Sequence, residues 1–390
     1  MRELRTILIA VFVVLAFAAG FLVRQWTSNA PQVSGVQAST ANKAAKLQRW
    51  VIDELQANYY KRVDVNALST AGVNGMLKSL HDPWTELMPA KEAAAFNEQL
   101  DGSYSGIGSG LELRKGLLTI TSVFAGSPAK AAGLRPGDAI VTIDGKATKG
   151  ESIDASVVRI KGKAGSHVRL QLRRRGRSGL IDVTLTRRQI VVPETRTKMY
   201  TTGGKKVGYV ELAVFAQGVG KTVARDVQQL QKQGAQWIVF DLRYNGGGLL
   251  NEGVSVASDF LSHGVVVTTK GLHSPLEVFQ ATGHPVTSLP MVVLVNRYTA
   301  SSSEIVAGAL QDNQRATLIG TRTFGKGLVQ TSTQLADGSI LKMTIAVYLT
   351  PLGHDINKKG LKPTISVVDN LKTRKDEQLQ AALRFIAGKK

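Results

Sequence analysis

The chain has 390 residues, 43% of them hydrophobic, and 39 glycines, which is typical of two or more globular units with many turns. It contains no cysteine, so disulfides, thiolate catalysis and cysteine-based zinc sites are excluded. Its net charge of +20 predicts attraction to anionic surfaces. The charge is scattered, however, and the densest basic cluster, "LRRRGR" at residues 172–177, lacks interleaved aromatics. It is either a solvated hairpin or an anion-binding patch.

The first residues predict a membrane segment. Arg2 and Arg5 precede an uncharged apolar stretch over residues 6–23, which as a helix spans roughly 27 Å, close to the thickness of a bilayer core. Two interpretations stay open for residues 1–26: a retained signal anchor and a cleaved signal peptide. With the basic end inside, either one exports the rest of the chain. Residues 27–45 are small and polar, and we interpret them as a linker.

The remaining chain shows four patterns in order. Residues 46–99 predict a helical region, because apolar residues recur at helical spacing. Residues 100–188 contain short β-type runs separated by Gly and Pro, which predict a small β domain. Residues 189–370 alternate apolar strands with helical stretches, as an α/β domain with crossover helices does. Residues 371–390 are expected to form a helical tail.

The β domain carries two motifs of a binding module. "SYSGIGSGLEL" places a glycine turn, Gly106, Ile107 and Gly108, before a strand, and such turns leave backbone N–H groups to face an anion. "SPAKAAGLRPGD" indicates a short capped helix followed by a turn. Together they resemble a PDZ domain of the protease-associated type. The resemblance implies that an extended peptide pairs with residues 109–113 while the glycine turn binds its terminal carboxylate. A glycine turn without a ligand is the alternative.

A serine triplet follows the apolar run "MVVLVN". Ser301 and Glu304 have the spacing of a capping box, so Ser301 is a natural N-cap for a helix over residues 302–311. This helix would travel about 15 Å away. A strand over residues 316–321 would return roughly 20 Å, which delivers Lys326 level with the serines. A buried neutral lysine can act as base for a serine nucleophile. A helix cap and a surface lysine are the alternatives.

"TASSSEIVAGALQDNQRATLIGTRTFGKGLVQ", together with "GYVEL", "DLRYNGGGLL" and the PDZ motifs, resembles the C-terminal processing peptidases, also called tail-specific proteases. The match extends from about residue 45 to about residue 370. It implies a multidomain α+β protein with an N-terminal helical region, a PDZ domain and an α/β protease core of the crotonase type. It also implies Ser301 rather than Ser303 as nucleophile, Lys326 as general base and Gln330 as the residue that orients the amine. Asp312 aligns with an acidic position interpreted as structural.

The resemblance further implies that backbone N–H groups of Ser302 and of the glycine turn hold the oxyanion, with Gly247 favoured and Gly248 as the alternative. Three departures from the family pattern stand out. Ser302 replaces an alanine, Gly246 replaces a proline, and "HDPWTEL" from His81 replaces a leucine-aspartate-proline start. We interpret the last as a change in helix packing more than in chemistry.

The partners also follow from the resemblance. It implies protein substrates bound through their C-termini, an adaptor protein, a homo-oligomer formed through the N-terminal helices and the C-terminal tail, and a PDZ domain that gates the site. It implies no metal, no nucleotide cofactor and no nucleic-acid partner. The expected location is the bacterial periplasm, with the N-terminal segment at the inner membrane. Two rivals are a catalytically inactive PDZ scaffold and a basic protein that binds anionic surfaces.

Overall fold

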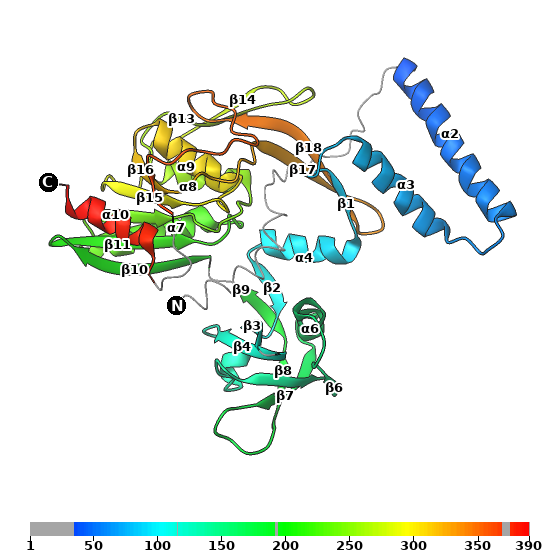
Figure 1. Cartoon of the computed structure of the whole chain (residues 1–390), viewed down its shortest axis with the longest axis horizontal. Helices are drawn as coiled ribbons and strands as arrows, with labels where there is room; N and C mark the ends of the chain where they lie inside the picture. The colour runs from blue at the N-terminus through cyan, green and yellow to red at the C-terminus, as the bar shows by residue number, and fades with distance from the viewer. Residues whose placement is uncertain (1–34, 115, 192–193, 369–374, 390) are drawn as a thin grey trace.

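The computed structural model describes residues 35–114, 116–191, 194–368 and 375–389 (Figure 1). Within these ranges no helix is both long and apolar enough to cross a membrane. The predicted membrane segment over residues 1–26 lies outside them.

Two helices, α2 (Gly35–Asn58) and α3 (Val65–Ser79), extend away from the body of the protein in Figure 1. The side chain of Asp64 caps α3 by accepting the N–H groups of Asn66 and Ala67. The predicted linker over 27–45 is wrong from residue 35 onward. Its Ala, Gln and Lys residues are good helix formers, so a polar composition there does not prevent a helix.

The expected PDZ domain is an antiparallel sheet with a small two-stranded ribbon beside it. The sheet order is β3-β4-β5-β7-β8, and β3 is at an edge. The helix α4 (Ala90–Leu100) lies between this domain and the core in Figure 1. The elements are β2 (Ser103–Gly106), β3 (Ser109–Arg114), β4 (Leu117–Val123), α5 (Pro128–Ala131), β5 (Ala139–Ile143), β6 (Lys146–Ala147), α6 (Ile153–Ile160), β7 (His167–Arg173), β8 (Ile181–Thr186) and β9 (Arg188–Val191), which pairs with β2.

The basic cluster at 172–177 lies where β7 turns into β8, which confirms the hairpin interpretation. Its middle arginine, Arg174, makes two contacts of 2.7 Å with the carboxylate of Asp138. The carboxylate is almost completely buried, so this arginine helps to fix the domain.

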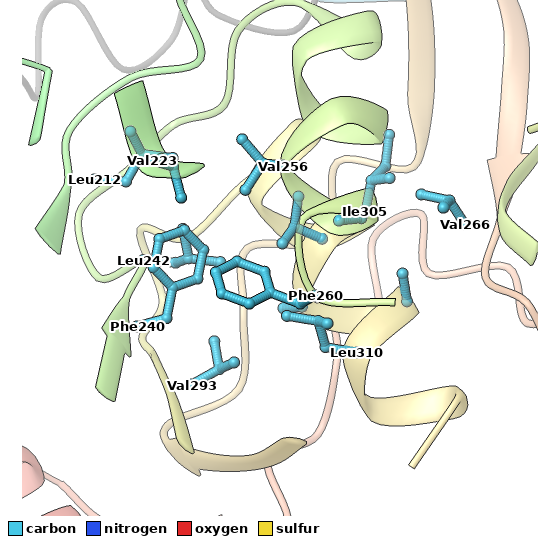
Figure 2. Packing of buried hydrophobic residues seen from close by; sticks show 14 of the residues in the cluster. Leu212, Val223, Phe240, Leu242, Val256, Phe260, Val266, Val293, Ile305 and Leu310 are labelled. Atoms are coloured by element: carbon cyan, nitrogen blue, oxygen red, sulfur yellow. The ribbon is translucent and has the colours of Figure 1, made fainter. Parts of the chain in front are cut away.

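The α/β core, the domain expected to be the protease, is built on a sheet of order β10-β11-β12-β15-β16-β19, parallel except for β10. Alternate residues of its strands face opposite sides. One side packs against α7, α8 and α9 and forms a buried hydrophobic cluster with them. Figure 2 shows Phe240 and Phe260 within this cluster. The other side packs against α10. The elements are β10 (Thr195–Thr202), β11 (Lys205–Leu212), α7 (Val219–Lys232), β12 (Trp237–Asp241), α8 (Leu250–Ser258), β15 (Met291–Val295), α9 (Ser302–Asp312), β16 (Ala316–Gly320), β19 (Ile365–Ser366) and α10 (Glu377–Ala387).

A second sheet joins the N-terminal region to the core. Its order is β1-β18-β13-β14, and β17 also pairs with β18. Glu86 of β1 is opposite Lys342 of β18, so a segment far upstream in the sequence lies on the hairpin that follows Lys326. The strands are β1 (Glu86–Met88), β13 (Val265–Lys270), β14 (Glu277–Gln280), β17 (Leu328–Gln334) and β18 (Ile340–Leu349).

Candidate active site

Ser301 occupies the junction between β15 and α9. It is the N-cap of α9, as the sequence predicted, and its side chain is nearly buried. Its backbone has φ 55° and ψ −121°, a conformation that residues with a side chain rarely adopt. The hydroxyl of Tyr348 donates to the carbonyl oxygen of Ser301 at 3.2 Å. Strain of this kind persists where the surroundings fix the backbone, and it often marks a functional site.

The chain returns to Ser301 as the helix and strand lengths predicted. Strands β15 and β16 are parallel with Met291 opposite Ala316 and Val295 opposite Gly320, so β16 ends level with the end of β15. The next residues lead to Lys326, which is 2% exposed. Burial, with a further contribution from the nearby Lys342, lowers the pKa of Lys326 to about 7. A base with a pKa near neutrality can exchange protons under physiological conditions.

Glu304 joins these two parts of the site. Its Oε2 accepts the backbone N–H of Ser301 at 3.0 Å and that of Lys326 at 2.9 Å. Its Oε1 accepts the N–H of Gly325 at 2.8 Å and the hydroxyl of Thr323 at 2.5 Å. The sequence identified this glutamate only as part of a capping box. No local sequence pattern indicates that Glu304 also binds residues 323–326, because those contacts depend on where the chain returns after β16.

Gln330 lies on β17 and is fully buried. Its Nε2 donates to Oγ1 of Thr344 at 3.3 Å. Its Oε1 has no hydrogen-bond partner among the residues that the structure describes. The glutamine therefore presents a buried acceptor on the strand that directly follows the lysine.

The glycine turn after β12 is adjacent to the serines, as the sequence predicted. A Cβ at Gly247 would lie 2.8 Å from the Cβ of Ser301 and 3.0 Å from the backbone nitrogen of Ser302. The N–H of Gly247, however, donates to Oδ1 of Asn245 at 2.8 Å. This contact counts against the preferred Gly247 and for the alternative, Gly248, and the choice between the two glycines as oxyanion donor stays a prediction.

The other two serines of the triplet have structural contacts. The hydroxyl of Ser302 donates to the carbonyl of Gly248 at 3.0 Å, and that of Ser303 donates to the carbonyl of Asn245 at 2.9 Å. Both hydroxyls thus attach the start of α9 to the glycine turn. Ser302 is also the first residue of α9, where backbone N–H groups lack a partner within the helix.

Trp84 was missed by the sequence interpretation, which assigned the "HDPWTEL" departure to helix packing. The amine of Lys326 lies 4.3 Å from the centre of the indole ring. The pairing of β1 with β18 brings this N-terminal residue to the site. Strand pairing over such a separation leaves no trace in local sequence patterns.

Asp312 stands at the opposite end of α9 from Ser301. The helix has eleven residues, so its ends are separated by about 15 Å. The Oδ2 of Asp312 accepts the N–H of Leu352 at 3.1 Å. This contact fits the structural role expected for it.

The PDZ glycine turn leads into the edge strand β3, as expected for peptide capture. Ile107 is buried and Gly108 has a positive φ of 75°. Burial raises the pKa of the Tyr104 phenol to about 12, and the nearby backbone N–H groups of Ser109 and Gly108 act against that rise. The phenol therefore lies beside the backbone of the glycine turn.

Known proteins share both domains. Residues 206–367 match peptidase family S41 and residues 105–185 match the PDZ domain family. The chain is 33% identical to the carboxy-terminal processing protease CtpA of Bacillus subtilis, covering 93% of this chain and 77% of that protein. It is 38% identical to a carboxyl-terminal-processing protease of a Synechocystis species, covering 87% and 82%.

A solved structure supports the same assignment. The photosystem II D1 C-terminal processing protease matches with a TM-score of 0.52 and 31% identity, covering 91% of this chain and 98% of that one. Both the sequence relatives and this structure agree with the PDZ domain and the protease core described above. The chain therefore belongs to peptidase family S41, among the PDZ-containing carboxy-terminal processing serine proteases.

Proposed function

We propose that the chain is an exported endopeptidase that binds protein C-termini through its PDZ domain and cleaves with Ser301 as nucleophile and Lys326 as base. The carboxylate of Glu304 carries this proposal. Because one buried oxygen accepts the backbone N–H groups of both residues, a single group fixes the nucleophile relative to the base.

The reaction follows from the groups present. The neutral amine of Lys326 takes the hydroxyl proton of Ser301, and the serine oxygen attacks the peptide carbonyl. The N–H groups of Ser302 and Gly248 hold the oxyanion. The ammonium then donates its proton to the leaving amine, and water hydrolyses the acyl-enzyme with the amine again as base. The buried Oε1 of Gln330, which has no other partner among the described residues, accepts a hydrogen bond from the ammonium and orients it in this proposal.

Peptide capture uses the free edge of the PDZ sheet. An extended chain adds to β3, and its terminal carboxylate binds the backbone N–H groups of the glycine turn beside the Tyr104 phenol. The names of the similar proteins, which refer to processing at a carboxyl terminus, support this choice of substrate. Unfolded, tagged or precursor proteins of the cell envelope are the proposed substrates.

The location and assembly complete the proposal. The apolar stretch over residues 6–23 supports a site in the bacterial periplasm, next to the inner membrane. A homo-oligomer is supported by the N-terminal helices, where Leu47 and Trp50 of α2 are 62% and 61% exposed and α3 has no buried residue. The apolar face of α10 already packs on its own core, so the N-terminal helices are the better interface. An adaptor protein is a further proposed partner.

Digestion of a tailed peptide tests the proposal. The parent, Ser301→Ala and Lys326→Ala are compared on one peptide with a free carboxylate and on its amidated form, and the products are identified by mass. We expect cleavage by the parent alone, and faster cleavage of the free carboxylate. Undiminished cleavage by either variant would contradict the dyad. Binding without cleavage by the parent would favour the scaffold, and salt-dependent binding to anionic vesicles alone would favour a basic surface binder.

A further inference from the structure

Trp84 is an aromatic residue that contacts the proposed base. The amine of Lys326 lies 4.3 Å from the ring centre, inside the separation of about 6 Å at which an aromatic face attracts a cation. Among aromatic side chains the indole attracts cations most strongly. The contact therefore combines the best ring type with a close approach.

The ring is held by several independent contacts. Its edge meets the ring of Phe324, with centres 6.1 Å apart and planes at 73°. The backbone N–H of Trp84 donates to Oδ1 of Asp82 at 3.0 Å. The hydroxyl of Thr85 donates to Oδ2 of that carboxylate at 2.6 Å and accepts the N–H of Thr344 at 3.0 Å. The segment before β1 is thus attached to β18, and the ring position is set by strand pairing.

The charges around the amine come from three parts of the fold. Lys342 on β18 lowers the pKa of Lys326 further than burial alone does, and it is ion-paired with Glu86 of β1. Glu86, Asp82 before β1 and Glu304 of α9 raise the pKa of Lys326. The indole face works in the same direction as the carboxylates, because it favours the charged amine. Unlike them, it cannot accept the proton.

We propose that Trp84 is a positioning residue whose indole face holds the amine of Lys326 and stabilises the ammonium that forms when Ser301 gives up its proton. The inference rests on the proposed dyad. The ammonium exists from this proton transfer until the leaving amine takes the proton. Weakening the ring should therefore slow acylation and make the amine easier to deprotonate.

Fluorination of the ring tests this with little change in shape. Tryptophan 84 is replaced site-specifically by its mono-, di- and trifluorinated analogues, which progressively weaken the negative face of the ring. We expect the acid limb of the pH profile of kcat/KM to move stepwise to lower pH, by about half to one unit in total, and the plateau to fall about 2- to 10-fold. The matched control is Trp237, which packs edge-on against Phe385 with ring centres 6.4 Å apart. The same analogues there should leave the profile unchanged.

A second readout does not depend on turnover. The fluorine resonance of monofluorinated Trp84, assigned by its loss in Trp84→Phe, should titrate near pH 7 in the parent and not in Lys326→Met. A titration that persists in Lys326→Met would overturn the proposal. The proposal would also be overturned if fluorination at position 84 left the acid limb of the pH profile unchanged while Ser301→Ala and Lys326→Ala were inactive. If Lys326→Ala instead cleaves like the parent, the dyad itself fails and this inference fails with it.

Discussion

Lys326→Met should stabilise the protein while abolishing its activity. The lysine is 2% exposed, and burial lowers its pKa from 10.5 to about 7. Below pH 7 the amine is charged in both the folded and unfolded states, so its full burial cost applies. A shift of this size corresponds to about 4 to 5 kcal/mol of unfolding free energy, at roughly 1.4 kcal/mol per pH unit. Methionine has a similar length and carries no charge.

The pH dependence has a definite sign. Between pH 7 and 10.5 the unfolded lysine still binds a proton that the folded lysine has released, so the cost declines as pH rises. The advantage of Lys326→Met should therefore be largest at pH 7 and below, and vanish above about pH 10.5. In a domain of this size each kcal/mol raises Tm by about 2 to 4 °C.

Calorimetric melting of parent and variant from pH 6 to 10 measures the effect. Lys342→Met is the control, because Lys342 is equally buried but ion-paired with Glu86, and its loss should destabilise the fold. A Lys326→Met protein that melts below the parent at pH 7, or whose advantage is constant with pH, would refute the reasoning.

Three further changes test neighbouring parts of the protein. Glu304→Gln replaces one acceptor oxygen by an amide NH2 group, so two of its four donors lose their acceptor and the other two keep only a neutral one. Each hydrogen bond to the charged group contributes about 1.5 to 3 kcal/mol, so kcat/KM on a tailed peptide should fall at least about 100-fold. A loss of only a few-fold would contradict its bridging role. Gly247→Ala adds a Cβ that would lie 2.8 Å from the Cβ of Ser301, at a position where φ is +102°. We expect the variant to be folded by circular dichroism and its activity to be reduced about 100-fold or more. Full activity would disprove the close approach. Tyr104→Phe removes a phenol oxygen that lies near the N–H groups of the glycine turn and could compete for them, so a peptide with a free carboxylate should bind about 2- to 10-fold more tightly by calorimetry. An amidated peptide is the control, and equal affinity for Tyr104→Phe and the parent would count against competition at the turn.

Local patterns were sufficient to predict the helix and the strand that position the candidate site, whereas the choice of Ser301 within the serine triplet came from the family resemblance. The helix over 302–311 and the strand over 316–321 differ from α9 and β16 by one residue each. Both elements are continuous in sequence, so their lengths alone bring Lys326 back to the level of Ser301. The PDZ turn was predictable for the same reason, because its glycines and the β3 strand are neighbours in the chain.

The rest of the site depends on contacts that local patterns do not encode. Trp84 reaches Lys326 only because β1 pairs with β18. The N–H of Gly247 donates to the side chain of Asn245. Sequence spacing does not reveal this contact, so it does not distinguish the two adjacent glycines as oxyanion donors. The start of α2 was missed because its polar residues favour a helix as well as a linker.

The most direct test of the central claim is to find which serine reacts. The parent is treated at pH 8 with a fluorophosphonate, and the adduct is located by fragmentation of the peptide that contains Ser301, Ser302 and Ser303. The account predicts a single adduct on Ser301 that is absent in Lys326→Met. An adduct on either neighbouring serine, or equal labelling of Ser301 in Lys326→Met, would contradict it.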